Sequence, residues 1–395
     1  MPNLSTDHSN AVLVENEDFK TGATRKDRFA SFAAADFEVP NGQEEDWRFT
    51  PMDRVGEFFD AELESALALV TAGSEAVEVV DRDDVRIGTV GVPDDRSSAI
   101  AWEKFEKAYV VTVPAGVPDY EVVVGLNAPE GMNSAHVAVF AEPHSTGTVV
   151  IEHTGVGELN EGIEITVGDE AELTVVSVQE AERTARHLSS QRLLVGRNAK
   201  VRHIVVTLGG DVVRVSTSLA YEGEGGEAEL LGAYVTEAGE HQEHRVFVNH
   251  GPANCTSNVA YKGALQGQGA HSVWIGDVLI QAQAANTDTY ELNRNLVLTE
   301  GAKADSVPNL EIETGDIASA GHASATGRFD EEQLFYLQAR GIPEDIARRL
   351  VVRGFFAELV EQIGVESVQQ KLMAAIEREL DLAELVAAGS EEEAE

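Results

Sequence analysis

The chain has 395 residues, 43% of them hydrophobic and 25% charged, and this composition argues against wholesale disorder and against a collagen-like fibre. Asp and Glu outnumber Lys and Arg 69 to 29, for a formal net charge of -40. Such a surface repels phosphate backbones and anionic lipid, so we expect neither nucleic acid nor a membrane surface as partner. The single cysteine excludes an internal disulfide and any multi-cysteine zinc or iron–sulfur site built by this chain alone.

The N-terminal residues are polar and lack the basic-then-apolar order of a secretory signal. No apolar run approaches the roughly 20 residues that a membrane-spanning helix needs. We therefore expect a soluble cytoplasmic protein.

The first predicted domain, residues 1–105, is expected to be mainly helical. Phenylalanines at helical spacing predict one helix over Lys26–Phe37, and a second apolar pattern predicts another over Val55–Ala72. Asp81–Arg86 and Pro93–Ser98 are polar and typical of turns.

Residues 106–327 form a second predicted domain, which is rich in strands. β-branched stretches recur, several alternate between apolar and polar positions, and glycine-bearing turns separate them. No amphipathic helix of ordinary length interrupts the zone, which argues against βαβ units and leaves a sandwich, a barrel or a solenoid. The predicted strands are Val110–Val113, Val122–Val124, Val137–Phe140, Val149–Ile151, Ile163–Val167, Leu173–Val178, Val201–Leu208, Val212–Leu219, Leu230–Val235, Val246–Val248, Val273–Ile280 and Leu296–Leu298.

A weak internal repeat slightly favours the solenoid. A Gly-x-x-Ala pattern followed by an apolar strand suits the corners of stacked coils, because glycine permits a positive φ and alanine fits inside a tight bend. The spacing of the copies is uneven. They are Gly168–Ala171, Gly196–Ala199, Gly225–Ala228, Gly267–Ala270 and Gly301–Ala304.

The third predicted domain, residues 328–389, is helical, and residues 390–395 form an acidic tail that we expect to be disordered. Asp330 and Gln333 resemble a capping box that opens a helix over Glu331–Arg340. Gly341 is expected to adopt the left-handed conformation, with Ile342 folding back on Leu337 as in a Schellman motif.

Pro343 is predicted to start a second helix, and a third is expected over about Glu366–Leu385. Apolar residues on the second helix form one stripe, which is expected to pack the C-terminal helices. Its members are Val352, Phe356, Leu359, Val360 and Ile363.

The common catalytic signatures are absent from the sequence. It has no phosphate-binding Gly-x-x-x-x-Gly-Lys-Ser/Thr loop, no Gly-x-Ser-x-Gly elbow, no His-Glu-x-x-His pair and no Gly-x-Gly-x-x-Gly. We therefore predict that the chain is not an enzyme and does not hydrolyse ATP by the phosphate-loop route.

Three histidines cluster in EHQEHRVFVNH, but their spacing does not favour a metal site. In a strand His241 and His244 point to opposite faces, and His244 and His250 stand roughly 20 Å apart. We interpret them as solvated or edge histidines. The lone Cys255 is interpreted as a small buried hydrophobe, not a ligand or nucleophile.

His322 is the candidate metal ligand. It lies in GHASATG (Gly321–Gly327), which we interpret as a small-residue crossing between the last strands and the helices. The alternative role is a hydrogen bond at the domain junction. Because one imidazole cannot hold iron or zinc alone, a metal site here must be completed by another chain.

At these residues the sequence resembles the SufB/SufD proteins of the Suf iron–sulfur cluster assembly system. The matching stretches are PNLEI (Pro308–Ile312), GHASATGRFDEEQLFYLQARGI (Gly321–Ile342), GFFAELVEQI (Gly354–Ile363) and, near the N-terminus, EEDWRFTP (Glu44–Pro51). The length of the chain and its single cysteine are closer to SufD than to SufB.

The resemblance implies a parallel β-helix core flanked by N-terminal and C-terminal helical domains. It implies a non-ATPase scaffold that pairs with a SufB-like paralogue through the β-helix and binds the SufC ATPase through its C-terminal helices. It also places iron or a nascent cluster at the SufB–SufD interface, near His322, with no cofactor held stably by the chain alone. Family members often carry a cysteine where this chain has Ala320.

Residues expected to reach the ATPase lie on the C-terminal helices, although packing within the chain is an equally good reading for each. They are Phe335, Arg348, Arg349, Phe355 and Phe356. The glycines of 321–327 suit a hinge that would transmit ATP binding to the SufB–SufD junction.

Two alternatives stay open. One is a SufB-like scaffold that forms a homodimer. The other is a β-helix protein that binds or cleaves polysaccharide, although the strand-rich zone holds only Trp274 among tryptophans.

Overall fold

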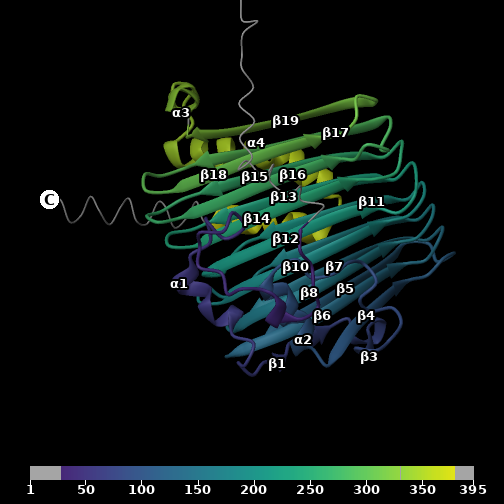
Figure 1. Ribbon diagram of the computed structural model, residues 1–395. Coiled ribbons are helices and arrows are strands. Elements are labelled where there is room, and N and C mark those ends of the chain that lie inside the picture. Colours follow the sequence, from purple (N-terminus) through teal and green to yellow (C-terminus); the bar gives the residue numbers. More distant parts are fainter. Residues whose placement is uncertain (1–27, 330, 379–395) are drawn as a thin grey trace, which may run out of the picture.

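The computed structural model describes residues 28–329 and 331–378 (Figure 1). Its centre is a β-solenoid in which the chain alternates between two sheets, so that each turn adds one strand to each sheet. Sheet A has the order β18-β16-β14-β12-β10-β8-β6-β4-β3, with β1 on β6, and sheet B the order β19-β17-β15-β13-β11-β9-β7-β5-β2. From β4 to β19 the pairing within each sheet is parallel. The prediction of a mainly β, solenoid core is confirmed.

The strands have the following bounds. Sheet A contains β1 (Ala66–Leu67), β3 (Glu78–Asp81), β4 (Lys107–Val113), β6 (Met132–Ala141), β8 (Glu158–Val167), β10 (Arg186–Val195), β12 (Val212–Tyr221), β14 (His241–His250), β16 (His271–Ile280) and β18 (Lys303–Ile312). Sheet B contains β2 (Leu69–Ala72), β5 (Tyr120–Ala128), β7 (Thr146–Gly155), β9 (Glu172–Gln179), β11 (Lys200–Thr207), β13 (Glu227–Thr236), β15 (Thr256–Leu265), β17 (Thr287–Val297) and β19 (Ile317–Arg328).

Every strand predicted within residues 106–327 lies within or largely overlaps an observed one, and four observed strands of that zone were missed: β10, β15, β18 and β19. In β10, β18 and β19 many inward positions carry polar or small residues in place of the expected apolar alternation, whereas β15 places Val259 and Tyr261 in the core. In β10, for example, the inward column begins with His187, Ser189 and Gln191, all buried. A polar or small-residue interior therefore hid β10, β18 and β19 from a search for apolar periodicity.

The corners of the solenoid explain the uneven repeat. Gly225, Gly267 and Gly301 have the positive φ expected of them, at 74°, 87° and 86°. At the two earlier copies Glu170 (58°) and Asn198 (50°) take the left-handed conformation instead. Asparagine tolerates this region better than most residues, so the corner does not demand glycine at one fixed place.

Residues 28–105 are less helical than predicted. α1 (Met52–Val55) is one turn, and α2 (Arg96–Lys104), capped by Asp95 through Ser98, is the longest described helix of this region. The helices predicted over 26–37 and 55–72 are wrong for the described residues. Phe29 packs on Phe37 and Phe32 on Trp102, whereas Phe58 and Phe59 pack against sheet A, and residues 66–67 and 69–72 form β1 and β2. Further 3-10 turns are Ala34–Asp36, Gly56–Phe59 and Ser74–Ala76. The domain division at residues 105 and 327 stays a prediction.

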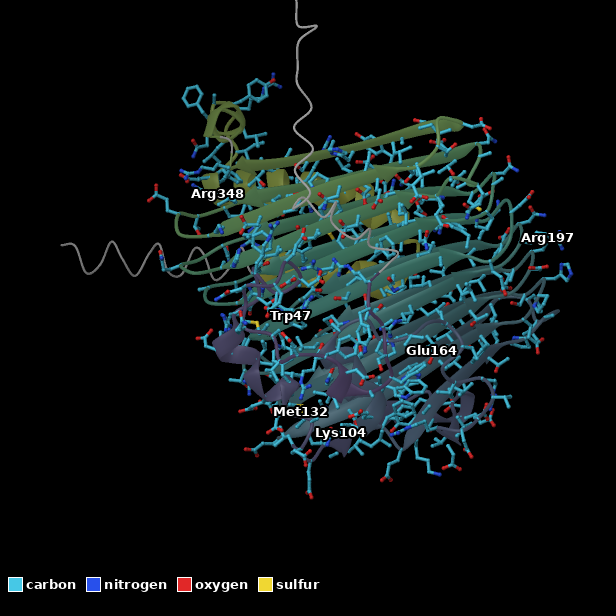
Figure 2. The ribbon with its side chains drawn as sticks, viewed as in Figure 1. Trp47, Lys104, Met132, Glu164, Arg197 and Arg348 are labelled. Carbon is cyan, nitrogen blue, oxygen red and sulfur yellow. The ribbon has the colours of Figure 1, made fainter. Side chains whose placement is uncertain are left out.

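The EEDWRFTP segment docks on the outer face of sheet A. Trp47, labelled in Figure 2, lies under the guanidinium of Arg214, whose Cζ is 3.6 Å from the ring centroid. The Thr50 hydroxyl donates to Glu243 Oε2 at 2.7 Å, and Arg245 binds both Asp46 and Glu243. Burial opposes ionisation of Glu243, but Arg214, His241 and Arg245 outweigh it and hold the pKa of that carboxyl below its usual range. The motif is thus a structural clasp.

Thr50→Val is expected to lower the free energy of unfolding by about 1.5–3 kcal/mol, because it removes the hydroxyl that donates at 2.7 Å to a buried carboxylate oxygen of Glu243. Urea denaturation of the full chain would measure this. Thr71→Val, at an exposed position, is the matched control and should change little. Equal midpoints for both variants would contradict the clasp.

The C-terminal helices cover the outer face of sheet B. α3 (Glu331–Gln338) and α4 (Glu344–Ile363) form a hairpin, and residues 366–378 are also helical. Gly341 has φ 84° and the Ile342 N–H bonds the Leu337 carbonyl at 3.2 Å, which confirms the predicted Schellman closure. The predicted stripe on α4 packs against sheet B and is buried except for Val360, which is half-buried. Asp330, the rest of the third helix and the acidic tail lie outside the described residues.

No helix within residues 28–329 and 331–378 is long and apolar enough to cross a membrane.

Candidate functional site at the open end of the solenoid

The solenoid ends in two uncovered strands, β18 and β19. They are the last strands of sheets A and B, 10 and 12 residues long, and they lie together at one end of the molecule (Figure 1). Most of their residues are exposed or half-buried, whereas the strands one turn further in are largely buried. A long edge with unpaired backbone groups is a template for pairing with another chain. Among the described residues nothing occupies it.

His322 lies on this end. It is paired in register with Glu291 of β17, and residues paired in a parallel ladder point to the same face, so His322 belongs to the inward column of the last turn. It is nevertheless exposed, because no further turn follows. The interpretation of 321–327 as a crossing with a hinge is wrong, since these residues form a regular part of β19, bonded along its length to β17.

Glu291 is a functional candidate that the sequence analysis missed. Its side chain is fully buried, and neither carboxylate oxygen has a hydrogen-bond partner among the described residues. Burial raises the pKa of Glu291 to about 8, and the charge of Asp277 adds to this. The signal in the sequence is the alternation of polar residues in TDTYELNRNLV, where Thr289, Glu291, Asn293 and Asn295 share one face.

Other polar groups beneath the open end also lack partners within the described residues. They are Trp274 Nε1, Ser306 Oγ and Ser272 Oγ. Trp274 and Ser306 are paired in register on sheet A, and a Cβ on Gly276 would lie 2.3 Å from the Trp274 ring and 2.7 Å from Glu291 Oε1. Gly276 thus makes room for both side chains. Buried polar groups are normally satisfied, so this cluster indicates an unfinished site.

The neighbouring positions of β17 are satisfied, which sets Glu291 apart. Tyr234 Oη donates to Asn295 Oδ1 at 2.6 Å and accepts from Asn293 Nδ2 at 3.0 Å. Asn295 in turn donates to Asn293, and it approaches Thr326 of β19 at 3.4 Å. These side chains form a closed ladder.

Among the described residues, the three histidines of β14 do not come together around one point. His241 and His244 point to opposite faces as predicted, but all three are buried, so the prediction of solvated or edge positions is wrong. His244 contacts Thr207 at 2.9 Å and His250 contacts Ser257 at 2.9 Å inside the solenoid. Burial lowers the pKa of His244 to about 3 and that of His250 to about 4, so both are neutral.

Cys255 is buried at a corner of the core, as predicted. Its Sγ lies 3.5 Å from the Gly223 carbonyl, and burial raises the pKa of the thiol. A neutral thiol in this position is neither a nucleophile nor a ready ligand.

The candidate partner residues on the C-terminal helices differ in exposure. Phe335 is 72% exposed, Phe355 is half-buried, and Phe356 is fully buried against sheet B. Arg348, labelled in Figure 2 beside α3, pairs with Glu344 at 3.0 Å, and Arg349 pairs with Glu377 at 2.9 Å. Exposed large apolar side chains gather on α3 and α4: Phe335, Tyr336, Ile346 and Leu350.

A two-sheet solenoid with an unfinished polar cluster at an open end suits a scaffold that shares its site with another chain. The family described as "SUF system FeS cluster assembly, SufBD core domain" matches residues 124–355. The chain therefore belongs to the SufBD family of iron–sulfur cluster assembly proteins. This confirms the resemblance and replaces the alternative of a polysaccharide-acting protein.

Curated relatives agree with this assignment. The chain is 49% identical to an iron–sulfur cluster assembly SufBD family protein of Mycobacterium tuberculosis, over 369 residues that cover 90% of this chain and 93% of the relative. It is 24% identical to the iron–sulfur cluster assembly protein SufD of Escherichia coli over 385 residues, 87% of this chain and 89% of the relative. It is 27% identical to SufD of Bacillus subtilis over 325 residues, 79% and 73% of the two chains.

Proposed function

We propose that this chain is the SufD-type, non-catalytic scaffold subunit of a cytoplasmic assembly complex and that it pairs with a SufB-like paralogue through β18 and β19. The observation that carries the proposal is the pair of uncovered edges beside the exposed His322. Addition of a partner strand to each edge would satisfy the free backbone groups and continue both sheets.

The proposed second partner is a SufC-like ATPase, which would dock on the hairpin of α3 and α4. The exposed apolar residues of this hairpin, with Phe335 on α3 the most exposed, support this site, and Arg348 and Arg349 lie on α4. ATP hydrolysis is assigned to that partner, because this sequence has no phosphate-binding loop. Phe356, which is buried between α4 and sheet B, would not touch the ATPase but would hold α4 in place beneath the docking surface.

His322 is the proposed ligand that this chain offers to iron, the cargo of the complex. A neutral imidazole is a common ligand for iron, and the adjacent Glu291 carboxyl offers an oxygen donor from the next strand. Sulfur and the other ligands would come from the SufB-like chain, because Ala320 stands where many relatives have cysteine and Cys255 is buried elsewhere.

A SufB-like homodimer is the competing assembly, since the same edges could pair with a second copy. Co-expression with SufB-like and SufC-like chains, followed by native mass spectrometry, separates the two. We expect a complex that contains all three chains. A stable homodimer that excludes the SufB-like chain would overturn the heterodimer, and absence of the ATPase would overturn the docking site on α3 and α4.

His322→Ala is expected to lower the iron content of the purified three-chain complex several-fold and to leave its assembly unchanged, because only a ligand is lost. Metal analysis and native mass measure the two quantities. His144→Ala is the matched control, an exposed histidine at a solenoid corner. If the His322→Ala complex retained its full iron content, the metal role would be excluded while the scaffold role would stand.

A further inference from the structure

A second group of metal-ligating side chains lies inside the solenoid, remote from His322. His153 of β7, Glu161 of β8 and His187 of β10 are 1%, 1% and 3% exposed. Each offers one ligand atom, and the three atoms lie within 4.8 Å of one another. Six strand spacings of sheet B separate β7 from β19, on the order of 29 Å, so this cluster is distinct from the open end.

The hydrogen bonds of His153 fix the proton on its ring. Nδ1 lies 3.0 Å from the carbonyl oxygen of Val178, which can only accept, so Nδ1 carries a hydrogen. Nε2 faces the Glu161 carboxylate at 3.1 Å. In the neutral imidazole this contact would set a lone pair against an anionic oxygen. It becomes favourable only when a second proton or a cation lies between them.

His187 reaches the same carboxylate without making a hydrogen bond. Its Nε2 lies 3.0 Å from Glu161 Oε1, yet this buried nitrogen has no hydrogen-bond partner among the described residues. Oε1 already accepts the Ser189 hydroxyl at 2.7 Å, and Ser189 accepts in turn from Gln191. The second ligand nitrogen of the cluster thus lies close to the carboxylate and is left unsatisfied.

We propose that His153, Glu161 and His187 bind one structural divalent cation of the zinc type. Two imidazole nitrogens and a carboxylate oxygen are ligands that Zn²⁺ and similar borderline cations use, at about 2.0–2.2 Å. Ligand atoms around such an ion stand about 3 Å apart, as two of the pairs here already do. The ion would satisfy both Nε2 atoms and leave the hydrogen bonds at Val178 and Ser189 in place.

The supporting contacts are those of a built site. A metal-binding histidine normally donates its other N–H to a carbonyl or carboxylate, as His153 does to Val178. One ligand comes from β7 of sheet B and two come from the paired strands β8 and β10 of sheet A, so the ion would tie the two sheets together across the interior. Its role would be to stabilise the early turns, independent of iron handling at His322.

Metal analysis of the full chain tests the proposal directly. The chain is unfolded in guanidinium with a chelator and refolded with Zn²⁺, with Co²⁺ or without metal, because the site is closed in the folded state. We expect one Zn²⁺ per chain after gel filtration and a midpoint of thermal unfolding several degrees above that of the metal-free chain. The Co²⁺ form should show visible d–d bands without a thiolate charge-transfer band.

Variants separate this site from the others. His187→Asn and the isosteric Glu161→Gln should lose the bound metal, whereas His322→Ala should retain it. A wild-type chain that refolds without retaining Zn²⁺ would overturn the proposal and leave a protonated His153 paired with Glu161. If His187→Asn and Glu161→Gln both fold and both retain the metal, the proposal is also overturned, whatever the result for His322→Ala.

Discussion

Glu291→Gln is expected to stabilise the isolated chain at pH 8 and to leave its stability nearly unchanged at pH 4. The folded-state pKa of Glu291 is raised to about 8, against about 4.3 in an unfolded chain, so the folded state holds a proton that the unfolded state gives up. The wild-type chain therefore loses stability as the pH rises from about 4 to 8. Glutamine avoids this loss, and the difference at pH 8 is on the order of 3–5 kcal/mol.

Urea denaturation of both chains at several pH values between 4 and 8 measures this difference. Glu121→Gln is the control, because Glu121 is exposed on β5 and should show no pH-dependent gain. A lower midpoint for Glu291→Gln at pH 8 would show that the carboxylate has a partner in solution. In the three-chain complex we expect the same substitution to be harmful: it should lower the iron content, since it removes a candidate oxygen ligand beside His322.

A proline in β19 is expected to abolish pairing with the SufB-like chain at one of two adjacent positions. Successive N–H groups of a strand point in opposite directions within the sheet. Of Ala323 and Ser324, one therefore bonds toward β17 and the other toward the open edge. Proline removes the N–H and places its ring there, so Ala323→Pro and Ser324→Pro form a matched pair.

The two variants should separate stability from assembly. The substitution on the β17 side should lower the thermal midpoint of the isolated chain. The one on the open side should leave that midpoint nearly unchanged and weaken binding of the SufB-like chain by 100-fold or more, measured by native mass spectrometry or pull-down. Normal binding of the SufB-like chain by the variant whose thermal midpoint is unchanged would rule out strand addition at β19.

The strands were predictable wherever burial on both faces left a run of β-branched residues. Val201–Leu208 and Val212–Leu219, for example, align with β11 and β12. The end of the helix at Gly341 was equally predictable from the sequence, because the left-handed conformation of the residue after a helix depends on that residue and its near neighbours alone. Elements of this kind can be predicted without knowing which residues far away in the sequence they contact.

The errors arise where tertiary contacts decide. The phenylalanines near residues 29–37 have helical spacing, but the structure uses them as separate anchors along irregular chain, with Phe29 against Phe37 and Phe32 against Trp102. Segment 321–327 reads as a flexible crossing because it is small and glycine-rich, yet a ladder to β17 makes it a strand.

The candidate site was only half predictable for the same reason. His322 stands out in a specific motif, but Glu291 precedes it by a full turn of the solenoid, and only the register places them together. The cluster of His153, Glu161 and His187 also joins three strands. Single-strand spacing arguments, like the one applied to residues 241–250, cannot find such a group.

The last turn of the solenoid has one neighbour where every inner turn has two. In stacked repeats the free energy of local opening depends on such nearest-neighbour contacts, so fraying should begin at β18 and β19. Within the described residues, the N-terminal clasp packs on β10, β12 and β14 of sheet A, and α4 contacts mainly β13 and β15 of sheet B, so both support the middle turns. Assembly with a second chain would then supply the missing turn, and completion of the fold would coincide with completion of the site.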